Sequence, residues 1–249
     1  MAIVCVPSVL LVALLGAGSQ GTAKKQTVRV VYETPTKPEQ APVAERMKQE
    51  HILEDAADML SMLKLPKLLT LHSRTCGESN AWYDSETHVL TFCYELVRDF
   101  IKMAEQSGHY ELTPEQAVVG PFLFIVLHET AHAVIHILAV PVLGQEEDAA
   151  DQLAVLAATH FGGDFADVHG LDRQRFYNVL CLAWGSDPKR YSFAKELGKL
   201  PDERAEGCAD EYHQVRYAVQ TLIRKSVDQK EVERIRQKAA RSKFGRSTP

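Results

Sequence analysis

Residues 127–154 read LHETAHAVIHILAVPVLGQEEDAADQLA, and this stretch says most about the fold. The apolar run 117–127 leads into it at helical spacing. Pro141 and Gly144 then end the helix, and a second helix is expected from about Gln145. The pattern predicts two consecutive helices that pack side by side, and small side chains allow their close approach at Ala149, Ala150 and Ala154.

The first of these helices contains the pattern H-E-x-x-H. His128 and His132 are one helical turn apart, so both side chains can face one metal ion. Glu129 lies about 100° further around the helix, where it can reach a water molecule at the metal without being a ligand. The competing interpretation is a buried helix with two hydrogen-bonded histidines, which leaves an ionised Glu129 without a purpose. The pattern therefore favours a metal site with Glu129 as general base.

The second helix offers the third metal ligand. A catalytic zinc ion usually has three protein ligands and one open position. Glu147 follows the first helix after a short turn, and Asp151, one turn further, can accept the free ring N–H of a ligating histidine. Glu146 is an alternative ligand, but it aligns less well with Asp151. His136 is another alternative, but eight residues after His128 it is rotated around the helix and too far along the axis to share one ion with His128. We expect Zn²⁺ to be held by His128, His132 and Glu147.

The N-terminal residues resemble an export signal. Residues 3–17 form an apolar run followed by small residues, so we expect a signal peptide over residues 1–23. An uncleaved anchor is the alternative. The second apolar stretch, 117–140, carries His128, Glu129 and His132 in its second half, which favours a buried helix of a soluble domain. The sequence thus predicts a secreted or periplasmic protein without a stable membrane span after signal cleavage.

Four cysteines remain once Cys5 leaves with the signal: Cys76, Cys93, Cys181 and Cys208. An even number in an oxidising compartment predicts two disulfides, for which three connectivities exist. Pairing of Cys76 with Cys93 and of Cys181 with Cys208 closes the shortest loops and is favoured. Four buried free thiols are the alternative, and a zinc site built from cysteines is disfavoured because no C-x-x-C spacing occurs.

Composition places the chain among ordinary globular proteins. It has 249 residues, 45% hydrophobic and 24% charged, with a net charge of −5. The hydrophobic content excludes a disordered chain, and the acidic balance argues against a nucleic-acid partner. We expect a linker or short pro-segment over residues 24–42, one domain over 43–225, and a basic C-terminal tail over 226–249. The oligomeric state has no signal in the sequence.

Several further elements are expected ahead of the H-E-x-x-H helix. The spacing of apolar residues predicts one helix over 43–65, ended by Pro66. Strands are expected over 67–73 and within 82–92, the latter folded into a hairpin about residues 84–86, and a helix follows over 93–106. Gly120 and Pro121 predict a kink or a break in the apolar run.

The zinc motifs resemble those of a known enzyme class. HETAH followed by ExxAD, at Glu147 to Asp151, is similar to the gluzincin class of zinc metallopeptidases. The wider pattern resembles the DUF4344 family, whose metallopeptidase function is inferred from these motifs. Matching stretches span about residues 45–220 and lie at 76–83, 93–96, 127–154, 184–188 and 204–208. His136 departs from the family pattern, in which an acidic residue is expected.

The resemblance implies an α+β fold of the zincin type, mostly helical, with a small β-sheet packed against the active-site helix. It also implies a zinc metallopeptidase that acts on a peptide or protein substrate. The alternative function is a zinc-bearing, non-proteolytic protein that binds peptides or cell-envelope components. Several tyrosines and histidines could stabilise an oxyanion, and the sequence singles out none of Tyr83, Tyr94, His160, Tyr191, Tyr212 and His213.

Overall fold

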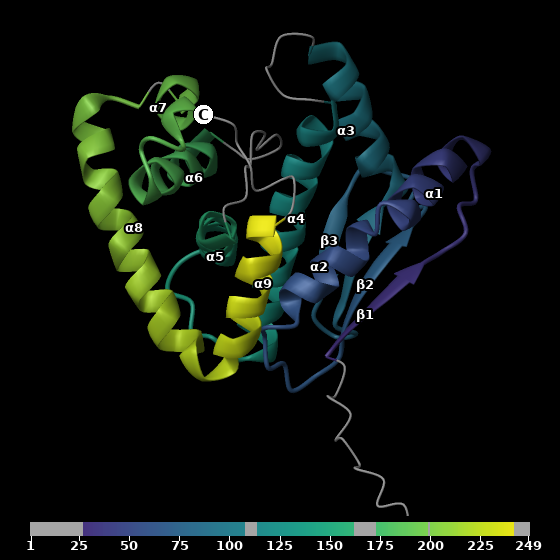
Figure 1. Ribbon diagram of the computed structural model, residues 1–249, viewed down its shortest axis with the longest axis horizontal. Helices are drawn as coiled ribbons and strands as arrows, with labels where there is room; N and C mark the ends of the chain where they lie inside the picture. Colours follow the sequence, from purple (N-terminus) through teal and green to yellow (C-terminus); the bar gives the residue numbers. More distant parts are fainter. Residues whose placement is uncertain (1–26, 108–113, 162–172, 199, 242–249) are drawn as a thin grey trace, which may run out of the picture.

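The computed structural model describes residues 27–107, 114–161, 173–198 and 200–241. The predicted signal peptide therefore lies outside the described residues. Figure 1 shows a small sheet with helices packed beside it and a second group of helices next to this layer. The fold is α+β and mostly helical, as the sequence predicts.

The sheet has four strands in the order β1-β2-β4-β3. Strands β1, β2 and β4 are parallel, and β3 runs antiparallel to β4 at the edge of the sheet. The bounds are β1 Val28–Tyr32, β2 Leu69–Arg74, β3 Ala81–Asp84 and β4 Val89–Cys93. Strands β3 and β4 form the expected hairpin, with Asp84 Oδ1 accepting hydrogen bonds from the N–H groups of Glu86 and Thr87 in the turn.

Nine α-helices and two short 3₁₀ helices occur within the described ranges. The first group comprises η1 Pro38–Gln40, α1 Ala41–Gln49, α2 Ile52–Leu60, α3 Tyr94–Ser107 and α4 Pro114–Ile137. The second group comprises α5 Glu146–Phe161, α6 Arg173–Ser186, α7 Ser192–Gly198, α8 Asp202–Ile223, η2 Arg224–Ser226 and α9 Gln229–Arg241.

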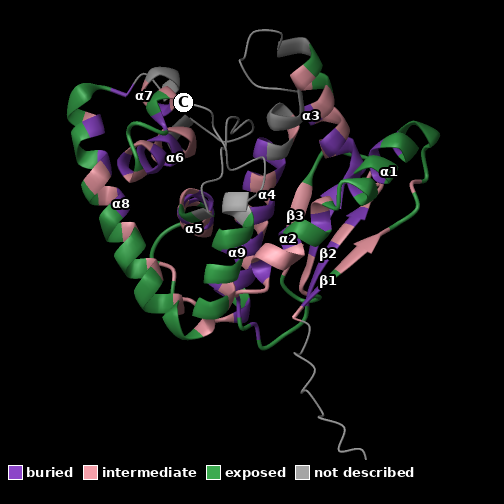
Figure 2. Ribbon diagram, in the orientation of Figure 1, coloured by how far each residue is buried: buried purple, intermediate pink, exposed green. Residues whose placement is uncertain are grey.

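Helix α4 lies between two hydrophobic clusters. Phe122, Val126 and Ala133 pack with strand residues such as Leu71 and Phe92 and with the helices beside the sheet. Phe124 and Leu127 join the cluster formed with α5 to α8. Burial from both sides explains why this helix is apolar all round. In the described part of the chain, one helical window, 120–137, is apolar and long enough to cross a membrane, and 67% of it is buried (Figure 2).

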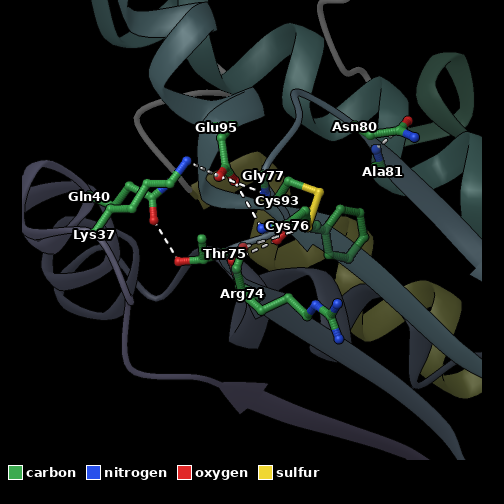
Figure 3. The surroundings of a disulfide bond; sticks show 12 residues. Lys37, Gln40, Arg74, Thr75, Cys76, Gly77, Asn80, Ala81, Cys93 and Glu95 are labelled. Carbon is green, nitrogen blue, oxygen red and sulfur yellow. Dashed lines mark hydrogen bonds and ion pairs between the residues drawn. A yellow bond between two sulfur atoms is a disulfide. The ribbon is translucent and has the colours of Figure 1, made fainter.

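Both favoured disulfide pairings form, and they connect different parts of the molecule. Cys76 and Cys93 link the loop after β2 to the end of β4 (Figure 3), and Cys181 and Cys208 link α6 to α8. Near the second disulfide, the backbone of Gly185 in α6 lies so close to Cys208 that any Cβ at position 185 would overlap its carbonyl group. A side chain would therefore force α6 and α8 apart.

The C-terminal region contains a helix. Residues 226–249 are expected to be a basic tail, and within them α9 folds back beside α2 and α5. Arg234 and Lys238 of α9 form ion pairs with Asp58 of α2. Val232 and Ile235 of the same helix are buried. Because this helix is amphipathic, its cations lie on the acidic surface of α2 while its apolar face is buried.

Three further expectations differ from the structure. Residues 28–32, inside the predicted linker, form β1, since Val28 and its neighbours pair with β2. The predicted helix 43–65 is two helices, because His51 adopts a left-handed conformation with a φ of 53° between α1 and α2. Helix α4 continues through Pro121 without a break. Of the three, β1 depends on pairing with a distant strand, which local spacing cannot report.

Candidate metal centre

Two neighbouring helices, α4 and α5, hold the site. Helix α4 ends at Ile137, and the chain turns into α5 through Ala139 and Gly144, which have positive φ angles of 50° and 111°. Ala150 and Ala154 of α5 are fully buried, so the two helices approach closely. The H-E-x-x-H segment of α4 therefore faces the first two turns of α5, as the spacing predicts.

Three donor groups converge between these helices. The Nε2 atoms of His128 and His132 lie 3.2 Å apart. Glu147 Oε2 lies 3.3 Å from His128 Nε2, and Glu147 Oε1 lies 3.4 Å from His132 Nε2. Ligands of a tetrahedral zinc ion with bonds of about 2.0–2.1 Å are separated by about 3.3 Å. The spacing of these side chains therefore suits a metal ion of this size, and one carboxylate and two imidazoles could hold it.

Each of these two histidines has a carboxylate at its other ring nitrogen. His128 Nδ1 lies 2.9 Å from Asp151 Oδ1, and His132 Nδ1 lies 2.6 Å from Glu146 Oε1. A carboxylate at Nδ1 favours the tautomer with a proton on Nδ1 and a free lone pair on Nε2. Both imidazoles are thus oriented for metal binding through the atoms that face Glu147.

The two alternative ligands lie beside the metal group rather than in it. Glu146 Oε1 contacts His132 Nδ1 and also lies 3.0 Å from His136 Nε2, so this carboxylate joins two histidines. The His136 ring is 5.8 Å from the ring of Tyr83 on β3. The adjacent residues Glu146 and Glu147 therefore have different neighbours, because successive side chains diverge by about 100° on a helix.

Arg175 of α6 completes the site, and the sequence offers no signal for it. Its Nε and Nη2 atoms donate to Asp151 Oδ2 and Oδ1 at 2.7 and 2.9 Å. Its Nη2 atom also lies 3.1 Å from Glu147 Oε2. Asp151 is buried, and although burial raises its pKa, His128 and Arg175 outweigh that effect and lower the pKa. The guanidinium thus keeps Asp151 anionic and contacts the third candidate ligand.

Glu129 occupies a separate position next to strand β3. Its carboxylate accepts a hydrogen bond from the backbone N–H of Tyr83. In an antiparallel pair, successive residues of a strand point their N–H groups alternately toward and away from the partner strand. Asn80 accepts a hydrogen bond from Cys93 N–H and so faces β4, and Tyr83, three residues later, therefore points its N–H away from β4 and toward α4. Burial raises the pKa of Glu129, while His128, His132 and the Tyr83 N–H act against it. Glu129 lies beside the metal group without belonging to it.

Most of the other tyrosines and histidines considered from the sequence are engaged elsewhere. The hydroxyl of Tyr94 donates to Glu33 O, and His160 accepts from Arg236. Tyr191 and Tyr212 belong to the cluster formed by α5 to α8. Tyr83 lies at the site through its backbone, while its hydroxyl is 2.7 Å from His88 Nδ1.

Comparison with known proteins gives one family. The model of the DUF4344 family, described as "Putative metallopeptidase", matches residues 32–164 and 160–223. No curated protein and no solved structure matches the chain significantly. The matched residues include α4, α5 and α6, and so every side chain of the site described above.

Proposed function

The chain belongs to the DUF4344 family of metallopeptidases, and on this premise we propose that it is a zinc-dependent peptidase. The observation that carries the proposal is the convergence of His128, His132 and Glu147 at the spacing of tetrahedral metal ligands. The family description implies a metal, and zinc follows from the donor set. Two imidazoles and one carboxylate with an open fourth position are typical of catalytic zinc sites.

When bound, zinc lowers the pKa of a water ligand and polarises the carbonyl group of the scissile peptide bond. His128, His132 and Glu147 would hold the ion. Asp151 and Glu146 would orient the two imidazoles, and Arg175 would restrain both Asp151 and Glu147. These outer contacts keep the donor atoms in place, so little reorganisation is needed when metal binds.

Glu129 is the general base in this mechanism. Its carboxylate takes a proton from the attacking water and later delivers that proton to the leaving amine. Partial burial raises the pKa of Glu129 and makes the carboxylate a stronger proton acceptor, and the Tyr83 N–H holds it at the edge strand. The side-chain set therefore separates metal binding from proton transfer.

Two disulfides indicate an oxidising compartment. Together with the apolar N-terminal segment, they support a secreted or periplasmic enzyme acting on peptides or proteins. The second candidate function is a non-proteolytic zinc protein that binds peptides or cell-envelope components, and it uses the same ligands without needing Glu129.

A mixed peptide library separates the two functions. The zinc-loaded protein should cleave it, and the Glu129→Gln variant should keep its zinc but lose activity by at least about 10²–10⁴-fold. Glu206→Gln, at an exposed position of α8, is the matched control and should cleave at the wild-type rate. Products would be identified by mass spectrometry.

Two results would contradict the proposed mechanism. Wild-type cleavage rates for Glu129→Gln would place the base elsewhere. Tight zinc binding without cleavage of any peptide would favour the binding protein.

A further inference from the structure

One end of the molecule gathers unpaired cations. Residues 62–64 and 226–228 are joined there by a β-bridge between Leu63 and Val227 and by backbone hydrogen bonds on both sides of it. The exposed cations beside this bridge are Lys64, Lys67, Arg224, Lys225 and Lys230. Within the described ranges, no carboxylate forms an ion pair with any of these five side chains. We call this surface the basic end.

Further along α9, two cations are paired with an acid of α2. Arg234 and Lys238, one to three turns further along α9, bind Asp58. Those two ion pairs attach α9 to α2, whereas the cations of the basic end form no ion pair with α2 in the described ranges. One exposed acid, Glu86, also lies at this end. It belongs to the turn between β3 and β4, and this turn is held next to the start of β2 by a hydrogen bond from Thr70 N–H to His88 O. Asp228, in the bridge segment, and Glu86 are acids at this end, and the five cations outnumber them.

Large apolar side chains are exposed among these cations. Leu68 is 43% exposed next to Lys67, and Leu222 is 49% exposed just before Arg224. An exposed leucine next to unpaired cations suits a surface with anionic groups above an apolar layer, which describes an anionic phospholipid bilayer. A nucleic acid or a soluble polyanion would match the charges but would leave the leucines without a role.

The N-terminal chain enters the fold at the same end. Thr27 O accepts a hydrogen bond from Leu69 N–H, directly beside Leu68. Figure 1 shows the start of β1 and the connection between α8 and α9 at one end of the molecule. In the sequence, Lys24, Lys25 and the apolar run 3–17 precede Thr27. Whichever of these residues the mature chain keeps are therefore attached at the basic end.

From these observations we propose that the basic end docks the protein on an anionic phospholipid membrane. Lys64, Lys67, Arg224 and Lys225 contact the lipid phosphates, and Leu68 and Leu222 reach the boundary of the acyl layer. A cation near such a surface strengthens binding by about fivefold, so four together produce a measurable affinity at low salt.

The test uses the mature protein collected after export and co-sedimentation with vesicles. Vesicles of phosphatidylglycerol and phosphatidylcholine should bind it, and vesicles of phosphatidylcholine alone should not. The variant K64Q/K67Q/R224Q/K225Q should bind the anionic vesicles at least about 100-fold more weakly. The variant K48Q/K102Q/K189Q/R216Q removes the same charge from exposed positions on other surfaces and should stay within about threefold of wild type.

A second pair of substitutions tests the apolar contribution. Leu68→Ser with Leu222→Ser should weaken binding to anionic vesicles by about tenfold, and circular dichroism should show that the variant is still folded, since both side chains are only half buried. Failure of the wild type to bind anionic vesicles would overturn the proposal. So would equal losses in the two charge variants, or retention on a soluble polyanion such as heparin without retention on vesicles.

Discussion

The candidate site is a set of side chains in which His128 and His132 each have their own carboxylate. Helical spacing alone predicts His128, Glu129 and His132, and it extends to Glu147 and Asp151 because the next helix returns alongside the first. The sequence presents Glu146 only as a rival ligand, whereas the structure places it at His132 Nδ1. Arg175 could not be predicted, since it belongs to a third helix and only the packing of α5 on α6 brings it to Asp151.

The contact between Asp151 and Arg175 should matter for both metal binding and stability. Asp151→Asn removes the anion at His128 Nδ1 and should lower zinc affinity by about 10–100-fold. Arg175→Met leaves Asp151 buried without its main cationic partner and should lower the free energy of unfolding by about 3 kcal/mol. Chelator competition measures the affinity, and urea titration measures the stability.

A double variant and a surface control complete this test. Asp151→Asn with Arg175→Met should recover much of the lost stability but none of the metal affinity. Arg204→Met breaks a half-exposed ion pair with Glu211 and should cost no more than about 1 kcal/mol. Normal zinc affinity in Asp151→Asn would show that His128 needs no orientation from this carboxylate.

Among the elements, those with a strong local period could be predicted and those that depend on distant partners could not. Helix α4 and the β3–β4 hairpin follow from spacing and turn residues. Strand β1 is only five residues long, and its partner β2 lies about forty residues away, so nothing nearby distinguishes it from a linker. The interruption between α1 and α2 depends on one left-handed residue, His51.

The crossing of α6 and α8 depends on a glycine. Gly185→Ala places a Cβ against the carbonyl of Cys208 and should lower the free energy of unfolding by about 1–3 kcal/mol. Gly207→Ala, in α8 with no atom near the added Cβ, should instead raise it by about 0.5–1 kcal/mol through helix propensity. Thermal or urea unfolding gives both values. A stabilising effect at position 185 would mean that the helices are not in close contact there.

The loop after β2 is attached to the start of α3 by Glu95. This buried carboxylate accepts hydrogen bonds from Cys76 N–H and Gly77 N–H at 3.2 and 3.0 Å (Figure 3). Burial acts to raise its pKa, but its own backbone N–H and those of Cys76 and Gly77 outweigh that effect and lower the pKa to about 2 from 4.5. A depressed pKa stabilises the fold fully above the unfolded value and less as pH falls toward the folded value.

Glu95→Gln should therefore be destabilising in a pH-dependent way. At pH 7 the variant should lose about 2 kcal/mol of unfolding free energy, because a charged acceptor becomes neutral. The difference from wild type should shrink as the pH falls from 4.5 toward 2, where the wild-type carboxyl also takes up a proton. Urea titrations across this range measure it, and a constant difference would argue against an ionised Glu95.

Across the whole molecule, helix α4 joins the sheet layer to the second group of helices, and α9 returns from the far end of the chain to α2. The ion pair between Arg234 and Asp58 spans 176 residues, so a basic terminal segment alone could not predict it. The metal group lies where α4 and α5 meet. One disulfide cross-links the sheet layer and the other links α6 to α8 in the second group of helices. Loss of metal should therefore change the site without unfolding the chain.

The central claim is that His128, His132 and Glu147 hold one metal ion, and metal content measured by elemental mass spectrometry tests it most directly. Wild-type protein purified without chelators should contain about one zinc ion per chain, and Glu147→Ala should contain almost none. Glu146→Ala should keep zinc at an affinity lowered by about 10–100-fold, because its side chain only orients His132. Full zinc in Glu147→Ala together with its loss in Glu146→Ala would contradict the ligand assignment, and a metal-free wild type would contradict the site itself.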